Sequence, residues 1–115
     1  MDRVHYAGTS IVTGTAVAHA LLDYAQALGQ IGASATVKIP TLNDDGSRGR
    51  SEILIGPSSQ LISDEEKSDH DEVLDADLVT RMHAEAVRLR NYGVSSPMAE
   101  VAQIDTARDQ SGYDF

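Results

Sequence analysis

A helical pattern near the N-terminus constrains the fold of this chain more than any other feature. Its apolar side chains recur at steps of four and three, the spacing that lines one face of an α-helix. These side chains are Val17, Leu21, Tyr24, Leu28 and Ile31. Thr13 or Thr15 can supply an N-cap hydroxyl, and Gly32 stands where a left-handed C-terminal residue is expected. The pattern predicts a helix at the centre of the core.

Short β-prone runs surround this helix, at residues 4–6, 11–13, 36–39, 52–55 and 60–62. The first two flank a Gly-Thr pair and predict a small hairpin or a bent strand. The third and fourth are separated by a stretch dense in turn formers, which predicts a second antiparallel hairpin. The last run predicts a short edge strand.

The second hairpin has apolar residues on both of its faces. We expect one face to lie against the helix; it carries Val37, Ile39, Ile53 and Ile55. Leu54 points to the opposite face. We therefore expect that face to be covered in part, by the C-terminal helices or by another subunit.

Acidic residues are concentrated in the C-terminal half of the chain. Residues 1–63 carry four basic and five acidic side chains, whereas residues 64–115 carry five and thirteen, out of a net charge of −9. Eight of the fourteen residues from 64 to 77 are acidic, a composition typical of a solvated, mobile linker. We therefore predict an α+β core at residues 1–63, an acidic linker at residues 64–77, and a helical extension with a tail at residues 78–115. The extension is expected to pack on the core or on a second subunit.

A second helix is predicted after the acidic run, with Asp75 or Asp77 as its N-cap and Gly93 at its end. Its apolar stripe comprises Leu78 or Val79, Met82, Ala86 and Leu89. Ser96 and Pro97 then resemble an N-cap followed by proline in the first turn, which predicts a further short helix. The remaining tail is polar except for two aromatic rings, Tyr113 and Phe115.

These patterns together predict an α+β fold. A small antiparallel sheet of three to four strands packs on one main helix, with a helical C-terminal extension after the acidic linker. A chain of 115 residues supports one modest core. Pairing two copies around the face of Leu54 would enlarge that core, so we expect a homodimer.

Composition and charge exclude several classes of function. Without cysteine there is no disulfide, thiolate zinc site or cysteine nucleophile. A net charge of −9 opposes binding to nucleic acids and anionic membranes. The sequence lacks the pattern of a secretory signal and a long apolar span, so we expect a cytoplasmic protein. No motif indicates a cofactor, and none is expected.

Four residues form a candidate ligand-binding site near the start of the first helix: Thr15, His5, His19 and Asp23. His5 and His19 can approach each other if the first strand packs beside the helix. Asp23 lies one turn beyond His19, and such a pair can orient an imidazole for general-base work. The backbone N–H groups at the start of the helix can also hold an anion. With no nucleophile or pocket evident, no catalytic residue is assigned.

Two patterns resemble metal sites, but each has a simpler explanation. Residues 69–71 combine Asp, His and Asp, yet they lie in the expected linker, where nothing fixes ligands in space. Residues 41–52 match a calcium loop at four positions, but the first position is Thr41 and the flanks predict strands. No metal site is predicted.

The functional expectation is a non-enzymatic protein that acts by self-association or by binding a basic protein partner. The partner-contacting residues would lie in the acidic run, at Asp64, Glu65, Glu66, Asp69, Asp71 and Glu72. The alternative is a small enzyme or ligand-binding domain with its site near the N-terminus of the first helix. Substitution of His19 would then change a ligand-dependent property without unfolding the protein.

Overall fold

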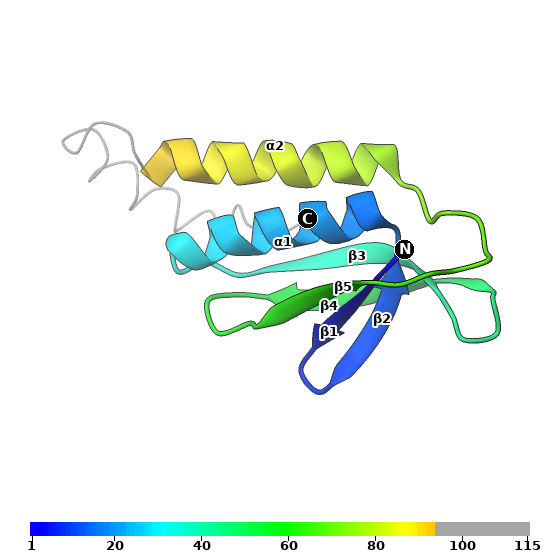
Figure 1. The fold of residues 1–115 in the computed structure, drawn as a ribbon. Helices are drawn as coiled ribbons and strands as arrows, with labels where there is room; N and C mark the ends of the chain where they lie inside the picture. The colour runs from blue at the N-terminus through cyan, green and yellow to red at the C-terminus, as the bar shows by residue number, and fades with distance from the viewer. Residues whose placement is uncertain (94–115) are drawn as a thin grey trace.

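The computed structural model describes residues 1–93, which form one antiparallel sheet and two helices (Figure 1). The strands are β1 (Asp2–Tyr6), β2 (Thr9–Thr13), β3 (Ala35–Leu42), β4 (Arg48–Ile55) and β5 (Leu61–Glu65), and the helices are α1 (Thr15–Gln30) and α2 (Ala76–Gly93). The strand order is β4-β3-β2-β1-β5. The predicted α+β class is confirmed, but the sheet has five strands instead of three to four. The predicted helix at Ser96 and the aromatic tail lie outside the described residues.

Both predicted hairpins are present. β1 and β2 are joined by Ala7 and Gly8, whose φ angles are +51° and +81°. Two consecutive residues with positive φ make the turn whose twist matches that of the flanking strands. β3 and β4 pair along their whole length, from Ala35 opposite Ile55 to Leu42 opposite Arg48.

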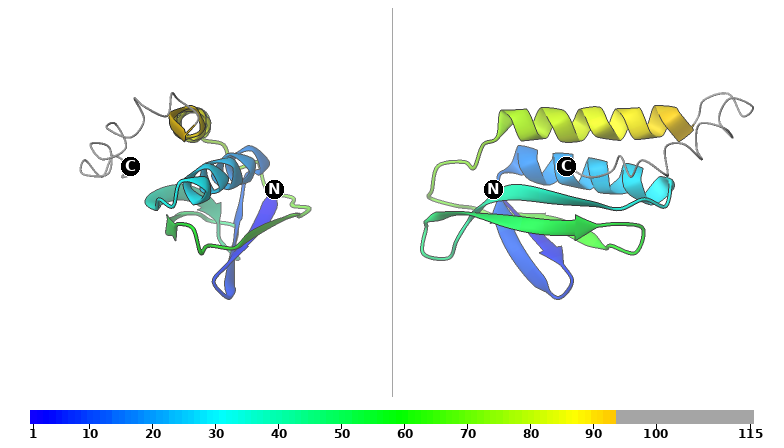
Figure 2. Two further views of the ribbon diagram at one scale, coloured as in Figure 1. Left: turned by 90° about the vertical axis from the view of Figure 1, so that its left-hand side faces the viewer. Right: turned by 180° about the vertical axis from the view of Figure 1, so that it is seen from behind.

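The sheet is strongly curled, because its two hairpins meet at a single pair. Val12 of β2 pairs with Leu42 of β3, and the hairpins diverge from that point (Figure 2). Residues 56–60 connect the two edge strands, β4 and β5, and so short a segment spans less than about 20 Å. The hydroxyl of Tyr6 in β1 donates a hydrogen bond to the carbonyl oxygen of Leu54 in β4. The two edges of the sheet therefore lie close together.

Helix α1 packs on the concave side of the sheet. Of its predicted stripe, Val17, Leu21, Tyr24 and Leu28 are buried. Ile31 lies at the C-cap, just beyond the helix, and is partly buried against the core. Gly32 has a φ of +69°, and the Ala33 N–H donates to the carbonyl of Leu28 at 3.0 Å, which closes the expected left-handed C-terminal motif.

The N-terminus of α1 differs from the prediction of a threonine cap. The N-cap is Gly14, without a side-chain bond. The hydroxyl of Thr13 donates to the carbonyl of Pro40 at 2.7 Å, and that of Thr15 donates to Asp2. Both threonines are thus used in contacts between elements that are distant in sequence.

Helix α2 lies on α1, on the side away from the sheet (Figure 1). Its predicted stripe, Leu78, Met82, Ala86 and Leu89, is buried. The predicted cap at Asp75 is confirmed, because its carboxylate accepts the Leu78 N–H at 3.1 Å. α2 therefore covers α1 and leaves Leu54 60% exposed, so the expected cover over that face is not supplied within residues 1–93. Neither helix in this range combines the length and apolar character that a membrane crossing requires.

Candidate functional site

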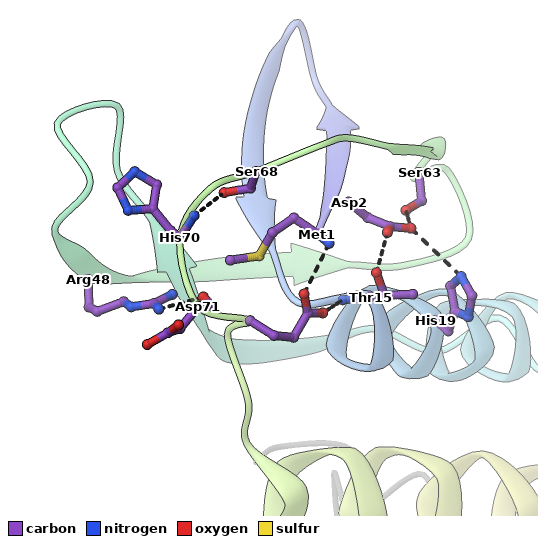
Figure 3. A network of polar contacts seen from close by, with 10 residues as sticks. Met1, Asp2, Thr15, His19, Arg48, Ser63, Ser68, His70 and Asp71 are labelled. Atoms are coloured by element: carbon purple, nitrogen blue, oxygen red, sulfur yellow. Dashed lines mark hydrogen bonds and ion pairs between the residues drawn. The ribbon is translucent and has the colours of Figure 1, made fainter.

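A polar network surrounds the start of α1 (Figure 3). At its centre is Asp2 of β1, which is 4% exposed. Its carboxylate accepts hydrogen bonds from the hydroxyls of Thr15 at 2.7 Å and Ser63 at 2.9 Å. Burial acts to raise the pKa of Asp2, but these two hydrogen bonds and the nearby His19 outweigh it and hold the pKa below its ordinary value. Asp2 thus links β1, α1 and β5 as a carboxylate.

The two histidines of the predicted site lie on different sides of the sheet. His19 Nε2 is 3.7 Å from Asp2 Oδ2, and its side chain is 66% exposed. His5 instead contacts Asp64 of β5 at 3.1 Å. Successive side chains of a strand alternate between faces. Since Asp2 and Val4 point toward α1, His5 points away from it, and the predicted approach of His5 to His19 does not occur.

Asp23 is bound to α2 instead of to His19. Its carboxylate forms a hydrogen bond with His83 Nδ1 at 2.8 Å and an ion pair with Arg90 at 2.6 Å. Burial acts to raise the pKa of Asp23, but these contacts outweigh it and lower the pKa. The predicted general-base arrangement of His19 and Asp23 is therefore replaced by a polar link between the two helices.

A groove nevertheless brings His19 and Asp23 together with the connection between β4 and β5. It has a volume of about 610 Å³ and is lined on its other side by Gly56, Pro57, Ser59 and Leu61. It places an exposed imidazole beside a carboxylate whose two oxygens already have partners. Of the four predicted ligand residues, this groove includes two, while Thr15 and His5 lie elsewhere.

The predicted anion position at the start of α1 holds a carboxylate of the same chain. Glu72 Oε2 accepts the Thr15 N–H at 2.6 Å, and Oε1 pairs with the amino group of Met1 at 3.1 Å. The Thr15 N–H and that amino group lower the pKa of Glu72. A helix N-terminus stabilises negative charge, and here the protein supplies that charge itself.

The acidic run differs from a detached linker, because it contacts the sheet along its course. Asp64 and Glu65 belong to β5, where they pair with Arg3 and Asp2 of β1. The residues that follow, 66–75, pass across the end of the sheet, and we call them the strap. Val73 in the strap is only 4% exposed.

Besides the contacts of Glu66 and Glu72, the strap lies close to the sheet and α1 through Val73, His70 and Asp71. The carbonyl of Val73 occupies the space beside Gly14. The ring of His70 lies over Gly46, 2.7 Å from where a Cβ would stand. Arg48 donates to the carbonyl of Asp71 at 2.6 Å (Figure 3). In the sequence, the docking of the strap was indicated by Val73, an apolar residue within the charged run.

Half of the six predicted partner-binding carboxylates have partners within the chain. Asp64 contacts His5, Glu66 forms a two-pronged hydrogen bond with Arg3 at 2.7 and 3.0 Å, and Glu72 caps α1. The other three, Glu65, Asp69 and Asp71, have exposed side chains. Within residues 1–93, no three His, Asp or Glu side chains gather in a way that could hold a metal ion.

The outer edge of β4 is a surface that the sequence reasoning missed. No strand of residues 1–93 pairs with it, and within this range only the Leu54 carbonyl on it is seen to accept a hydrogen bond, from Tyr6. The Asn43 N–H donates to the backbone carbonyl of Ser47 at 2.8 Å, and hydrogen-bonded pairs alternate along an antiparallel ladder. The backbone groups of the odd-numbered residues of β4 therefore face β3. Those of the even-numbered residues, Arg48, Arg50, Glu52 and Leu54, point outward. The bond from Tyr6 to the Leu54 carbonyl agrees with this assignment.

The sequence contained a signal for the direction of these backbone groups. Pro40 lies opposite Arg50, and proline has no N–H to donate, so it fits only at a position without a ladder hydrogen bond. The exposed aliphatic side chains Leu54 and Ile62 lie on the two edge strands, and each is 60% exposed.

Comparison of this chain with known protein families, curated proteins and solved structures found no significant match.

Proposed function

We propose that the protein acts by associating with a second copy of itself through the open edge of β4. The observation that carries this proposal is an eight-residue edge strand whose next-to-last residue, Leu54, is 60% exposed. An edge strand presents unpaired N–H and C=O groups in a row, which can pair with the backbone of another chain. Apolar surface beside such a row adds a favourable burial term.

The distribution of carboxylates supports self-association over capture of a basic partner. Asp64, Glu66 and Glu72 are engaged with His5, Arg3 and the start of α1. A basic partner would have to compete with these internal contacts. β4, in contrast, carries exposed side chains of both signs in Arg50 and Glu52, which suits a surface that meets a copy of itself; its third exposed charged side chain, Arg48, is bonded to the strap.

Sedimentation velocity over a wide concentration range tests this proposal. The mass should rise from that of the 12.3 kDa chain toward twice that value as concentration increases. Leu54→Lys should weaken association, whereas Val87→Lys, at a 54% exposed position on α2, should leave it unchanged. A constant monomer mass up to millimolar concentration would reject the proposal.

A second candidate function is binding of a small polar ligand in the groove beside α1. It is favoured by His19 and Asp23, which share a groove of about 610 Å³, within the range of about 300 to 1,000 Å³ typical of ligand pockets. Titration with a library of small polar fragments should move the amide NMR signals of His19, Asp23 and Ser59. His19→Ala should abolish these shifts and leave the protein folded. Fragments that move no signal in this groove would exclude the candidate.

A further inference from the structure

We infer that two copies pair antiparallel through β4, centred on Ser51, so that Arg50 of each copy faces Glu52 of the other. This inference rests on the proposed self-association and specifies its surface and register. It follows from the direction of the backbone groups and from the order of charges along one strand.

The backbone first restricts the registers. In an antiparallel pair, residues that exchange hydrogen bonds must both direct their N–H and C=O groups across the interface. On β4 these are the even-numbered residues, as the ladder with β3 requires. A symmetric pairing can therefore be centred on any residue of β4, but it always sets even-numbered residues opposite even-numbered ones. Their side chains share one face of the sheet.

The charges then select among these registers. Centring on Arg50 places two Arg50 side chains opposite each other, and centring on Glu52 does the same for two glutamates. Centring on Gly49 sets Arg48 against Arg50. Like charges directly opposite each other destabilise a sheet, whereas opposite charges stabilise it.

Centring on Ser51 avoids every like-charge pair and, unlike centring on Ile53, Leu54 or Ile55, sets opposite charges against each other. Arg50 then faces Glu52 twice, once on each side of the two-fold axis, and Arg48 faces Leu54 twice. The aliphatic part of an arginine can cover an apolar side chain while its guanidinium stays in water. This register thus matches the charges and shields the exposed leucine. At its end, the Leu54 carbonyl would exchange its hydrogen bond from Tyr6 for one from Arg48 of the second copy. The contact is self-complementary, as a two-fold dimer requires.

Charge reversal provides a sharp test, because the two single variants complement each other. In Arg50→Glu, both facing pairs become Glu–Glu, and in Glu52→Arg both become Arg–Arg. Each variant alone should associate about tenfold or more weakly than the wild type. In an equimolar mixture, every facing pair joins a glutamate to an arginine, so a heterodimer should form with an affinity near that of the wild type. Asp69→Arg, a reversal on the exposed strap, is the matched control and should leave the dimer intact.

Cross-linking through an introduced cysteine tests the register independently, so the inference can still be tested if a charge variant fails to fold. At the centre of the register, Ser51 faces Ser51 of the second copy in a pair without hydrogen bonds, where Cα atoms lie about 4.5 Å apart. This separation suits a disulfide. The chain has no cysteine of its own. Ser51→Cys should form a linked dimer under mild oxidation, and Ser47→Cys, in the exposed turn, should not.

The outcomes separate the register from the proposed function. A wild-type protein that stays monomeric rejects self-association and the register with it. A wild-type dimer whose single charge variants associate normally, or whose variants fail to complement each other, overturns the register alone. A wild-type dimer in which Ser51→Cys does not cross-link does the same. Circular dichroism of each variant confirms that its fold is retained.

Discussion

The carbonyl oxygen of Val73 lies where a Cβ atom on Gly14 would stand. This contact joins the strap to the N-cap of α1, and only a residue without a side chain permits it. Gly14 is itself buried, so the neighbouring backbone cannot move outward into solvent without opening the end of the sheet.

We therefore predict that Gly14→Ala destabilises the protein by about 1 to 3 kcal/mol, the typical cost of overpacking against a fixed neighbour. Gly29→Ala is the matched control, because nothing lies within 4 Å of its Cβ position. Alanine there should be neutral or stabilise α1 by up to about 1 kcal/mol. Urea unfolding of both variants measures the difference, and equal stabilities would contradict the close contact.

A second prediction concerns the buried carboxylate of Asp2. Asp2→Asn should cost about 1 to 3 kcal/mol at neutral pH, because the amide leaves one of the two part-buried hydroxyl partners of this buried side chain imperfectly paired. The folded pKa of Asp2 is below its ordinary value of 3.8, so its contribution is present above that value and is lost as pH falls through the folded pKa. The stability gap between wild type and variant should therefore close in acid.

Urea unfolding at a series of pH values from neutral to about pH 3 tests this dependence. Asp69→Asn, on the exposed part of the strap, serves as a control and should follow the wild-type curve. A gap that stays constant across the series would show that Asp2 does not act as a carboxylate in the folded protein.

A third prediction concerns the anion at the start of α1. Glu72→Gln should lower stability by about 0.3 to 1 kcal/mol, the usual size of a charge effect at a helix end. We expect the lower half of that range, because the Glu72 side chain is 39% exposed and water screens its charge. Glu65→Gln should have no measurable effect. Thermal unfolding in low salt compares the two, and an equal loss for both would argue against capping by Glu72.

A fourth prediction tests how tightly α2 is docked on α1. Met82 has no exposed surface, and replacing it with alanine should cost about 2 to 5 kcal/mol through the cavity left behind. Val87 lies on the same helix but is 54% exposed, so Val87→Ala should change stability by less than about 0.5 kcal/mol. Similar small losses for both variants, measured by denaturant unfolding, would show that α2 contributes little to the core.

Local patterns were sufficient to predict most elements of this fold. The spacing of Leu21, Tyr24 and Leu28 identifies α1, Gly32 identifies its end, and Asp75 caps α2, because each depends on neighbours within a few residues. The pairing of β5 with β1 depends instead on contacts between distant segments, such as Leu61 opposite Tyr6. No short-range pattern encodes that partner choice.

The site could be predicted less well for the same reason. Sequence spacing suggests that Asp23 pairs with His19 one turn away, but docking of α2 offers His83 and Arg90 as closer partners. Strand alternation then separates His5 from His19. Packing between segments that are distant in the sequence thus decides which polar groups meet. Sequence spacing alone does not distinguish these partners from other polar residues.

The strand order also governs when the sheet can be completed during synthesis. β1 precedes every other described element in the chain, yet it lies inside the sheet, between β2 and β5. Its first edge is closed at once by the β1–β2 hairpin. Its second edge must wait until residues 61–65 have left the ribosome, because only β5 pairs there. Throughout that interval a nascent chain presents an open interior strand, which can accept a strand from a neighbouring copy before it accepts its own.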